Sequence, residues 1–251
     1  MESGTDDVFR GLWRLTWIET KVFIREPMGV IGNLLVPVLL FVVFGRVLVR
    51  DGAGMAAESA PFNIPVMAAL FIAVSAVISL VTIISIYREG GILKRLRATP
   101  LTPVTILGAH VFVKLAFTLA GLGLLVLAGR RVFPGALDIN LPSFAVALLL
   151  GTLSILSMGF VMASLVPTAR FAQPLAAALL YPMIAISGLF FPISALPDGL
   201  RALAHILPTT HTVTLLEGVW AGRGWDLPST VALVSLGLAF TAIASRVFRW
   251  E

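Results

Sequence analysis

Six stretches of about 20 mostly apolar residues constrain this chain more than any other feature, because an α-helix of about 20 residues crosses the roughly 30 Å core of a bilayer. Hydrophobic residues make up 58% of the 251 residues and charged residues only 12%, against roughly 25% charged in a soluble domain. This composition excludes a soluble globular domain, a disordered chain and a nucleic-acid-binding domain. The sequence therefore predicts an all-α membrane protein with six transmembrane helices, at about 28–49, 62–87, 104–128, 144–166, 171–191 and 227–248.

The basic residues between these stretches predict the orientation of the chain in the membrane. With the N-terminus inside, 11 of the 18 Lys and Arg residues fall in cytoplasmic segments, six fall in outer segments, and Lys114 lies within a span. We therefore expect a multi-pass protein with both termini in the cytoplasm. No short apolar stretch near the N-terminus ends in a cleavage site, so no removable signal peptide is expected.

The first 27 residues predict an amphipathic helix that precedes the six-span region 28–251. Between Asp7 and Glu26 no proline interrupts the segment, and Pro27 ends it. A stripe of basic side chains with tryptophans beside it is typical of a helix lying in the plane of the lipid headgroups. The residues of interest on this helix are Arg10, Arg14, Trp17, Lys21 and Arg25. The helix is either a topology anchor or a lever that lies against a cytoplasmic partner.

The most informative connection follows the second span, where residues 88–103 read REGGILKRLRATPLTP. Gly90 and Gly91 loosen the end of the span, and the following residues form a short amphipathic helix. Thr99-Pro100 and Thr102-Pro103 each pair an N-cap residue with proline at the first helical position. A plain cytoplasmic loop does not need these features, so we expect a short, capped functional element.

This segment resembles the cytoplasmic loop of type-2 ABC transporter permeases, especially the drug-resistance exporters. In that family a pattern of roughly Glu-Gly-Thr is followed by Leu and then Thr-Pro, and here Gly91 stands where Thr is common. The resemblance implies that 89–97 is a coupling helix docking on a separate ATP-hydrolysing subunit, and that the N-terminal helix is an interface helix. The residues implied in coupling are Arg88, Glu89, Gly90, Gly91, Leu93, Lys94, Arg95 and Arg97.

Between the fifth and sixth spans, two apolar segments at 196–207 and 213–220 are each too short to cross a bilayer. Prolines separate them, and such segments are typical of re-entrant or interfacial helices. They resemble the re-entrant outer hairpin of the same permeases, which implies an outer gate. The expected gate residues are Phe190, Phe191, Pro192, Pro197 and Pro208. An ordinary interfacial loop is the alternative.

The chain has no sequence for ATP hydrolysis of its own. Its only lysines are Lys21, Lys94 and Lys114, and none follows a glycine as a phosphate-binding loop requires. We therefore expect no catalytic residue, no metal site and no cofactor on this chain, with ATP and magnesium bound by the partner subunit. The three histidines are expected at helix ends or packed between helices. An intramembrane hydrolase is a distant alternative.

His110 and Lys114 stand one helical turn apart in the third span. A lysine in mid-span costs roughly 2.5–3.5 kcal/mol on insertion scales. Either Lys114 snorkels or is paired in the bundle, or the two residues line the transport pathway. Both alternatives stay open at this point.

The sequence thus predicts the membrane-spanning subunit of an ATP-driven exporter in a bacterial inner membrane. By resemblance, two copies of this chain form the path and two ATPase subunits bind them, with the first and fifth spans at the interface. We favour a hydrophobic or amphiphilic substrate, such as a drug-like compound or a lipid. The alternatives are a polysaccharide or glycolipid exporter of the same family, an ion-coupled carrier, and a scaffold that transports nothing. No acidic residue lies within the six spans, which argues against the ion-coupled carrier.

Overall fold

The computed structural model describes residues 3–25, 64–91, 103–132, 140–166, 168–189 and 192–247, together with six isolated positions between 31 and 43. Throughout these residues the structure consists of helices and short connections, which confirms the all-α class. The first expected span, 28–49, lies outside the continuously described residues, so the count of six spans stays a prediction.

Four helical segments within the described residues are long and apolar enough to cross a membrane. They correspond to the second, third, fourth and sixth expected spans. Their bounds are Ile64–Glu89, Val111–Ala128, Leu141–Leu165 and Leu227–Val247.

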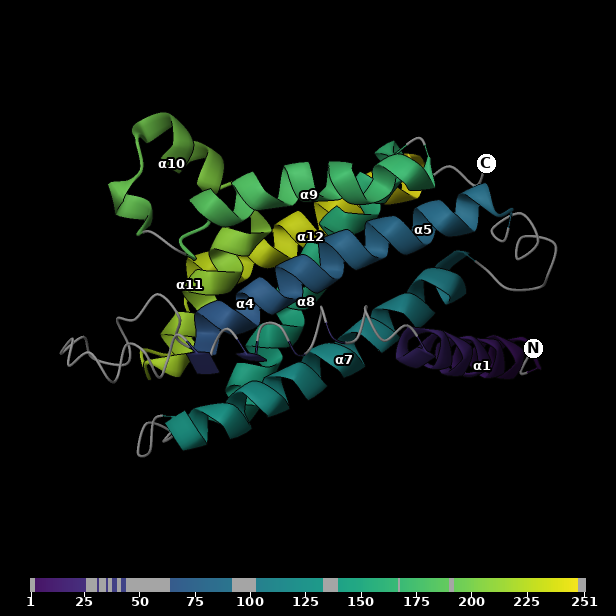
Figure 1. The fold of residues 1–251 in the computed structure, drawn as a ribbon, viewed down its shortest axis with the longest axis horizontal. Helices are drawn as coiled ribbons and strands as arrows, with labels where there is room; N and C mark the ends of the chain where they lie inside the picture. The colour runs from purple at the N-terminus through teal and green to yellow at the C-terminus, as the bar shows by residue number, and fades with distance from the viewer. Residues whose placement is uncertain are drawn as a thin grey trace.

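The described helices follow the predicted segments closely, with most ends shifted by a few residues. Figure 1 shows their arrangement. In chain order they are α1 (Ser3–Arg25), α4 (Ile64–Val74), η2 (Ser75–Ser79), α5 (Leu80–Glu89), α7 (Pro103–Val132), α8 (Leu141–Leu165), α9 (Ala169–Ile186), η3 (Ile193–Ala195), α10 (Asp198–Ala204), α11 (Pro208–Trp220) and α12 (Leu227–Val247).

The fifth expected span ends earlier than the sequence predicted. α9 stops at Ile186 instead of reaching 191, because Gly188 adopts a φ of +90° that no helix continues through. Pro174 and Pro182 lie inside α9 without ending it. At 1.5 Å per residue its 18 residues span about 27 Å, slightly less than the core of a bilayer.

The helical run α4–η2–α5 forms the centre of the bundle. Most of its side chains are buried, and it packs against α7, α8, α9 and α11. The five residues of η2 have π-helical hydrogen bonding, which interrupts the α-helix in the middle of this run. This central position explains why the second expected span carries the most uniformly apolar sequence.

Glycines allow the helices around this centre to approach closely, as the small residues of the spans predicted. A Cβ on Gly151 of α8 would lie 2.5 Å from Thr212 Cγ2 of α11, and one on Gly159 would lie 3.2 Å from the Ala76 carbonyl oxygen. Hydroxyl groups add a contact between α8 and α12, since Thr241 Oγ1 donates to Ser157 Oγ at 3.1 Å.

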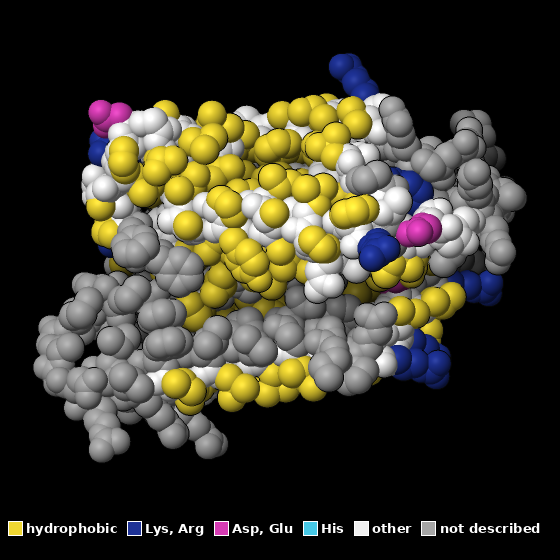
Figure 2. All heavy atoms as spheres, turned by 45° about the horizontal axis from the view of Figure 1, so that its top comes forward, with side chains coloured by type: hydrophobic (Ala, Val, Ile, Leu, Met, Phe, Trp, Pro, Cys, Tyr) yellow, Lys and Arg dark blue, Asp and Glu magenta, His cyan; other side chains and the backbone are white. Residues whose placement is uncertain are grey.

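The helices define two ends of the bundle (Figure 1). At the α1 end lie α1, the last residues of α5, the start of α7 and the ends of α8 and α12; at the opposite end, the hairpin end, lie α10 and α11. Figure 2 shows hydrophobic side chains across the middle of one face and charged side chains towards both ends. This is the distribution that a bilayer requires of a spanning bundle.

Candidate functional site

The last turn of α5 is held by two neighbouring side chains that reach different helices. The Tyr87 hydroxyl donates a hydrogen bond to Glu19 Oε1 of α1 at 2.8 Å. The Arg88 guanidinium donates to two carbonyl oxygens at the end of α8, from Nη1 to Val166 at 2.8 Å and from Nη2 to Ala163 at 2.9 Å. A cation on the last carbonyls of a helix satisfies acceptors that have no partner within that helix. The end of α5 is therefore fixed to both α1 and α8.

Glu19 is a buried carboxyl group on the part of α1 that otherwise carries only basic charges, from 8 to 25. Only 4% of the residue is exposed, and burial raises its pKa above the ordinary value of 4.5. The hydrogen bond from Tyr87 and the charge of Lys114 act in the opposite direction. Lys114 of α7 is itself only 5% exposed. We call Glu19, Tyr87, Arg88 and Lys114 the α5 junction.

The environment of Lys114 favours one of the two alternatives left open by the sequence. Its burial, and its electrostatic effect on Glu19, match a side chain paired within the bundle. α1 packs along α7, and a Cβ on Gly108 would lie 3.3 Å from Leu12 Cδ1. The side chain of His110 lies outside the described part of the chain, so its expected place in the pathway stays a prediction.

The exposed face of α1 combines basic and aromatic side chains. Arg14, Trp17, Lys21 and Arg25 are all exposed, and the Lys21 ammonium lies 5.1 Å from the centre of the Trp17 ring. The Arg10 side chain lies outside the described part. Because the opposite face packs on α7, the basic face is the one left to meet lipid or a partner.

The coupling segment is described only at its beginning. Glu89 and Gly90 are exposed, and Gly91 turns the chain with a φ of +67°. This conformation is strained for residues with a Cβ and needs glycine. The remaining expected coupling residues, Leu93, Lys94, Arg95 and Arg97, lie outside the described residues.

The hairpin (192–220) contains three short helical pieces in place of the two segments that the sequence suggested. η3 lies just before the first predicted segment and α10 lies within it. α11 begins at Pro208, five residues earlier than expected, because proline suits the first turn of a helix. Pro192 and Pro197 stand at the N-caps of η3 and α10. The three prolines thus set the shape of the hairpin, while Phe190 and Phe191 lie outside the described residues.

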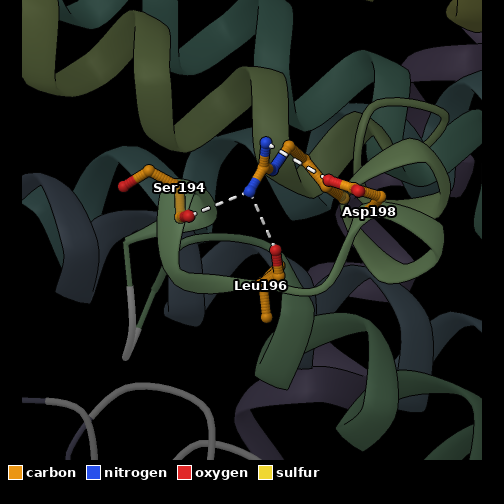
Figure 3. A network of polar contacts seen from close by, with 4 residues as sticks. Ser194, Leu196 and Asp198 are labelled. Atoms are coloured by element: carbon orange, nitrogen blue, oxygen red, sulfur yellow. Dashed lines mark hydrogen bonds and ion pairs between the residues drawn. The ribbon is translucent and has the colours of Figure 1, made fainter.

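One arginine organises the first part of the hairpin (Figure 3). Arg201 Nη2 donates to the carbonyl oxygens of Ser194 and Leu196, each at 3.0 Å, and Nη1 lies 3.6 Å from Asp198 Oδ1. The carbonyls that it satisfies belong to the turn around η3. Arg201 therefore stabilises the local backbone without linking separate spans.

The rest of the hairpin is attached to the starts of α8 and α12. His211 Nε2 lies 2.9 Å from the His205 carbonyl oxygen, to which it donates. Asp226 caps α12 by accepting from the Ser229 backbone N–H at 2.8 Å. Hydrogen bonds from Ser229, with a smaller contribution from the charge of His211, hold the pKa of Asp226 below its ordinary value of 3.8.

Trp225 completes this attachment, since its Nε1 donates to Ser143 Oγ of α8 at 2.8 Å. The position of His211 agrees with the expected place of the histidines at helix ends. Among the residues that the structure describes, no group of three or more His, Asp or Glu side chains is placed to hold a metal ion.

The sequence reasoning did not identify Glu19 or Tyr87. A signal for Glu19 was present, because it is the single acid between 8 and 25 and shares a helical face with Leu12 and Leu15. A single carboxylate on an apolar face and a single lysine in an apolar span are each costly to bury alone, so the sequence itself suggests that they pair. No comparable signal marks Tyr87, whose role depends on the packing of α5 beside α1.

Comparison with known proteins adds an independent result. Residues 10–219 match the family model described as ABC-2 type transporter. The chain is 27% identical over 201 residues to the inner membrane transport permease YhhJ of Escherichia coli K12, which covers 75% of this chain and 54% of YhhJ. This chain therefore spans about half the length of that relative.

Two shorter matches are with proteins named nodulation protein J. That of Bradyrhizobium diazoefficiens is 36% identical over 70 residues, covering 28% of this chain and 27% of the relative. That of Sinorhizobium fredii is 41% identical over 44 residues, covering 18% and 17%.

Proposed function

The chain belongs to the ABC-2 type transporter family, and from this premise we propose that it is the membrane-spanning permease subunit of an ATP-driven exporter whose ATPase is a separate polypeptide. The observation that carries the proposal is the α5 junction. It fixes the helix end immediately before Gly91 to α1 and to α8, which suits a segment that receives force from outside the bundle.

The location of the α1 end supports the proposed orientation. α1 exposes basic side chains beside tryptophan, a composition that suits the anionic cytoplasmic leaflet. We therefore assign the α1 end to the cytoplasm and the hairpin end to the outside. The similarity to YhhJ, an inner membrane transport permease, supports a place in the inner membrane.

The energy source is proposed to be ATP held with magnesium on the partner subunit. The sequence contains no glycine-lysine pair of the kind that cradles phosphate, and this supports the proposal that the force comes from a partner subunit. Glu89 and the basic residues of 93–97 are the proposed contacts with that chain. In the closed state of the ATPase the segment is pushed, the spans tilt, and the hairpin opens.

Two copies of this chain are proposed to enclose the path. α9 and α12 expose large apolar side chains along much of their length, which leaves surface for lipid and for a second copy. The outer-gate role of Phe190, Phe191 and the hairpin prolines belongs to the same proposal, as does a hydrophobic or amphiphilic substrate.

The test is co-purification with a soluble chain that carries a Gly-x-x-x-x-Gly-Lys-Ser/Thr loop, sought first in the neighbouring reading frames, followed by ATPase assays in nanodiscs. We expect a stable complex whose hydrolysis rate rises with the permease, and loss of that rise in Glu89→Ala and Arg95→Ala. Arg223→Ala is the matched control, because Arg223 is exposed near the hairpin end. Solute movement driven by an ion gradient without any ATPase would overturn the proposal.

A further inference from the structure

We propose that Glu19, Tyr87 and Lys114 form a buried polar lock that fastens α1 to both helices flanking the segment 90–102, so that α1, α5 and α7 move as one unit. This inference rests on the proposed function for the source of the force. The lock itself is a property of this chain alone, and it gives each of the three residues a positioning role in transmission.

The connectivity places the lock on both sides of the coupling segment. α5 ends at Glu89 and α7 begins at Pro103, and both of these ends lie at the α1 end (Figure 1). Tyr87 stands two residues before the end of α5 and reaches Glu19 through its hydroxyl. Lys114 stands three helical turns into α7, and its charge acts on the same carboxyl group. A displacement of the segment 90–102 is therefore transmitted to Glu19 both through Tyr87 of α5 and through Lys114 of α7.

The chemistry of the three groups makes the contact specific. A carboxylate and an ammonium are costly to bury alone, and each lowers the cost of burying the other. The Tyr87 hydroxyl satisfies one carboxylate oxygen at 2.8 Å. Sliding α1 along α7 would separate the charges in a poorly solvated place, so the arrangement resists relative motion more strongly than apolar packing does.

The lock also explains why a lysine stands within the third span. With 5% of its surface exposed, Lys114 is not placed to contact a solute in this conformation. Its role is then to hold α7 to α1, and substitution is expected to alter transmission without altering which solutes are bound. This expectation separates the lock from a pathway-lining lysine.

The absence of cysteine from the sequence makes a direct test convenient. A spin-label pair on Ile18→Cys of α1 and Phe112→Cys of α7, both at exposed positions, reports the distance between these helices by pulsed electron resonance. In otherwise unchanged protein bound to the ATPase, we expect a narrow distribution that ATP with vanadate leaves in place. In Glu19→Gln the distribution should broaden at least twofold.

A milder variant and a rescue keep the test informative if one variant fails to fold. Tyr87→Phe removes a single hydroxyl and should broaden the distribution less than Glu19→Gln. Glu19→Lys combined with Lys114→Glu restores opposite charges and should narrow it again. In the complex, we expect Glu19→Gln to keep the ATPase bound but to reduce the permease-dependent stimulation of ATP hydrolysis at least threefold. The charge exchange should restore that stimulation.

The outcomes separate the two proposals. If no ATPase binds, the proposed function fails, while the label distances still test the lock in the permease alone. A broad distribution in unchanged protein, or one that Glu19→Gln leaves unaltered, would overturn the lock. The lock would also be overturned if the protein with both Glu19→Lys and Lys114→Glu folds but its distance distribution stays as broad as that of Glu19→Gln.

Discussion

The two ends of the bundle are stabilised in different ways. At the α1 end, Tyr87 of α5 donates to the buried Glu19 of α1, the charge of the buried Lys114 of α7 acts on the same carboxyl group, and Arg88 reaches across to α8. In the first part of the hairpin, Arg201 contacts carbonyls and a carboxylate within eight residues of chain, and its Asp198 partner has a side chain 99% exposed. The first arrangement joins separate spans, whereas the second shapes one segment.

This difference suggests where motion is transmitted and where it is received. A junction between helices passes displacement from one element to the next, because its members cannot part without exposing buried polar groups. The first part of the hairpin, η3 and α10, is stabilised within its own segment and can move with little effect on the spans, whereas α11 packs against α4, α8 and α12. Variants at the α1 end should therefore have larger effects than variants in the hairpin.

The largest effect is expected from Lys114→Met, which leaves Glu19 buried without its compensating charge. Removal of one partner of a buried pair costs about 3–5 kcal/mol. The melting temperature in detergent should fall strongly, and the fall should grow as pH rises, because burial raises the pKa of Glu19 and protonation removes the uncompensated charge. Glu19→Leu combined with Lys114→Met should recover most of the loss; failure to do so would contradict the pairing.

A smaller loss is expected from Gly151→Ala, at the contact between α8 and α11. The new Cβ would lie 2.5 Å from Thr212 Cγ2, so the helices must separate. Overpacking of this kind costs about 1–3 kcal/mol. Gly123→Ala in α7 is the matched control, since no described atom lies within 4 Å of the position that its methyl group would take and a helical alanine is favoured. Equal melting temperatures for the two variants would refute the close contact.

The pH dependence of stability should differ in sign between the two ends. The pKa of Glu19 is raised above 4.5 by burial, so its contribution is complete below pH 4.5 and is lost as pH rises through the folded value. The pKa of Asp226 is lowered below 3.8, so its contribution is present above pH 3.8 and is lost as pH falls through the folded value.

Melting temperatures of two variants between pH 3 and pH 8 check both signs. Glu19→Gln should remove the decline on the alkaline side, and Asp226→Asn should remove the decline on the acidic side. Because each change involves one carboxyl group, we expect these effects to be smaller than that of Lys114→Met. Curves parallel to those of the unchanged protein would show that neither group contributes.

The smallest effect is expected from Arg201→Ala. The two hydrogen bonds and the exposed ion pair contribute about 1 kcal/mol together, because water replaces much of what is lost. Hydrogen exchange should increase in 193–204 and stay unchanged at the α1 end. Arg201→Lys should recover part of the protection; increased exchange in α5 would contradict the separation of the two ends.

The sequence anticipated much of the fold because apolar length is a local property. Four expected spans match helices of the structure within a few residues, and the prolines of the hairpin stand where helical pieces begin. The end of α9 was misjudged, because an apolar run through Gly188 does not reveal a positive φ. The first span and most of the coupling segment fall outside the described residues, so those predictions stand as they were.

By itself, the sequence determined a membrane-embedded helical protein, because the length and the hydropathy of its apolar segments are local properties that can be read along the chain. Only the tertiary structure decided which polar residues meet. Tyr87 donates to Glu19 from 68 positions away, and the charge of Lys114, 27 positions further on, acts on the same carboxyl group, because α1 lies beside α5 and α7. Burial stabilises an apolar side chain beside any apolar neighbour. A buried charge, in contrast, is stabilised only by the specific group that packing brings beside it.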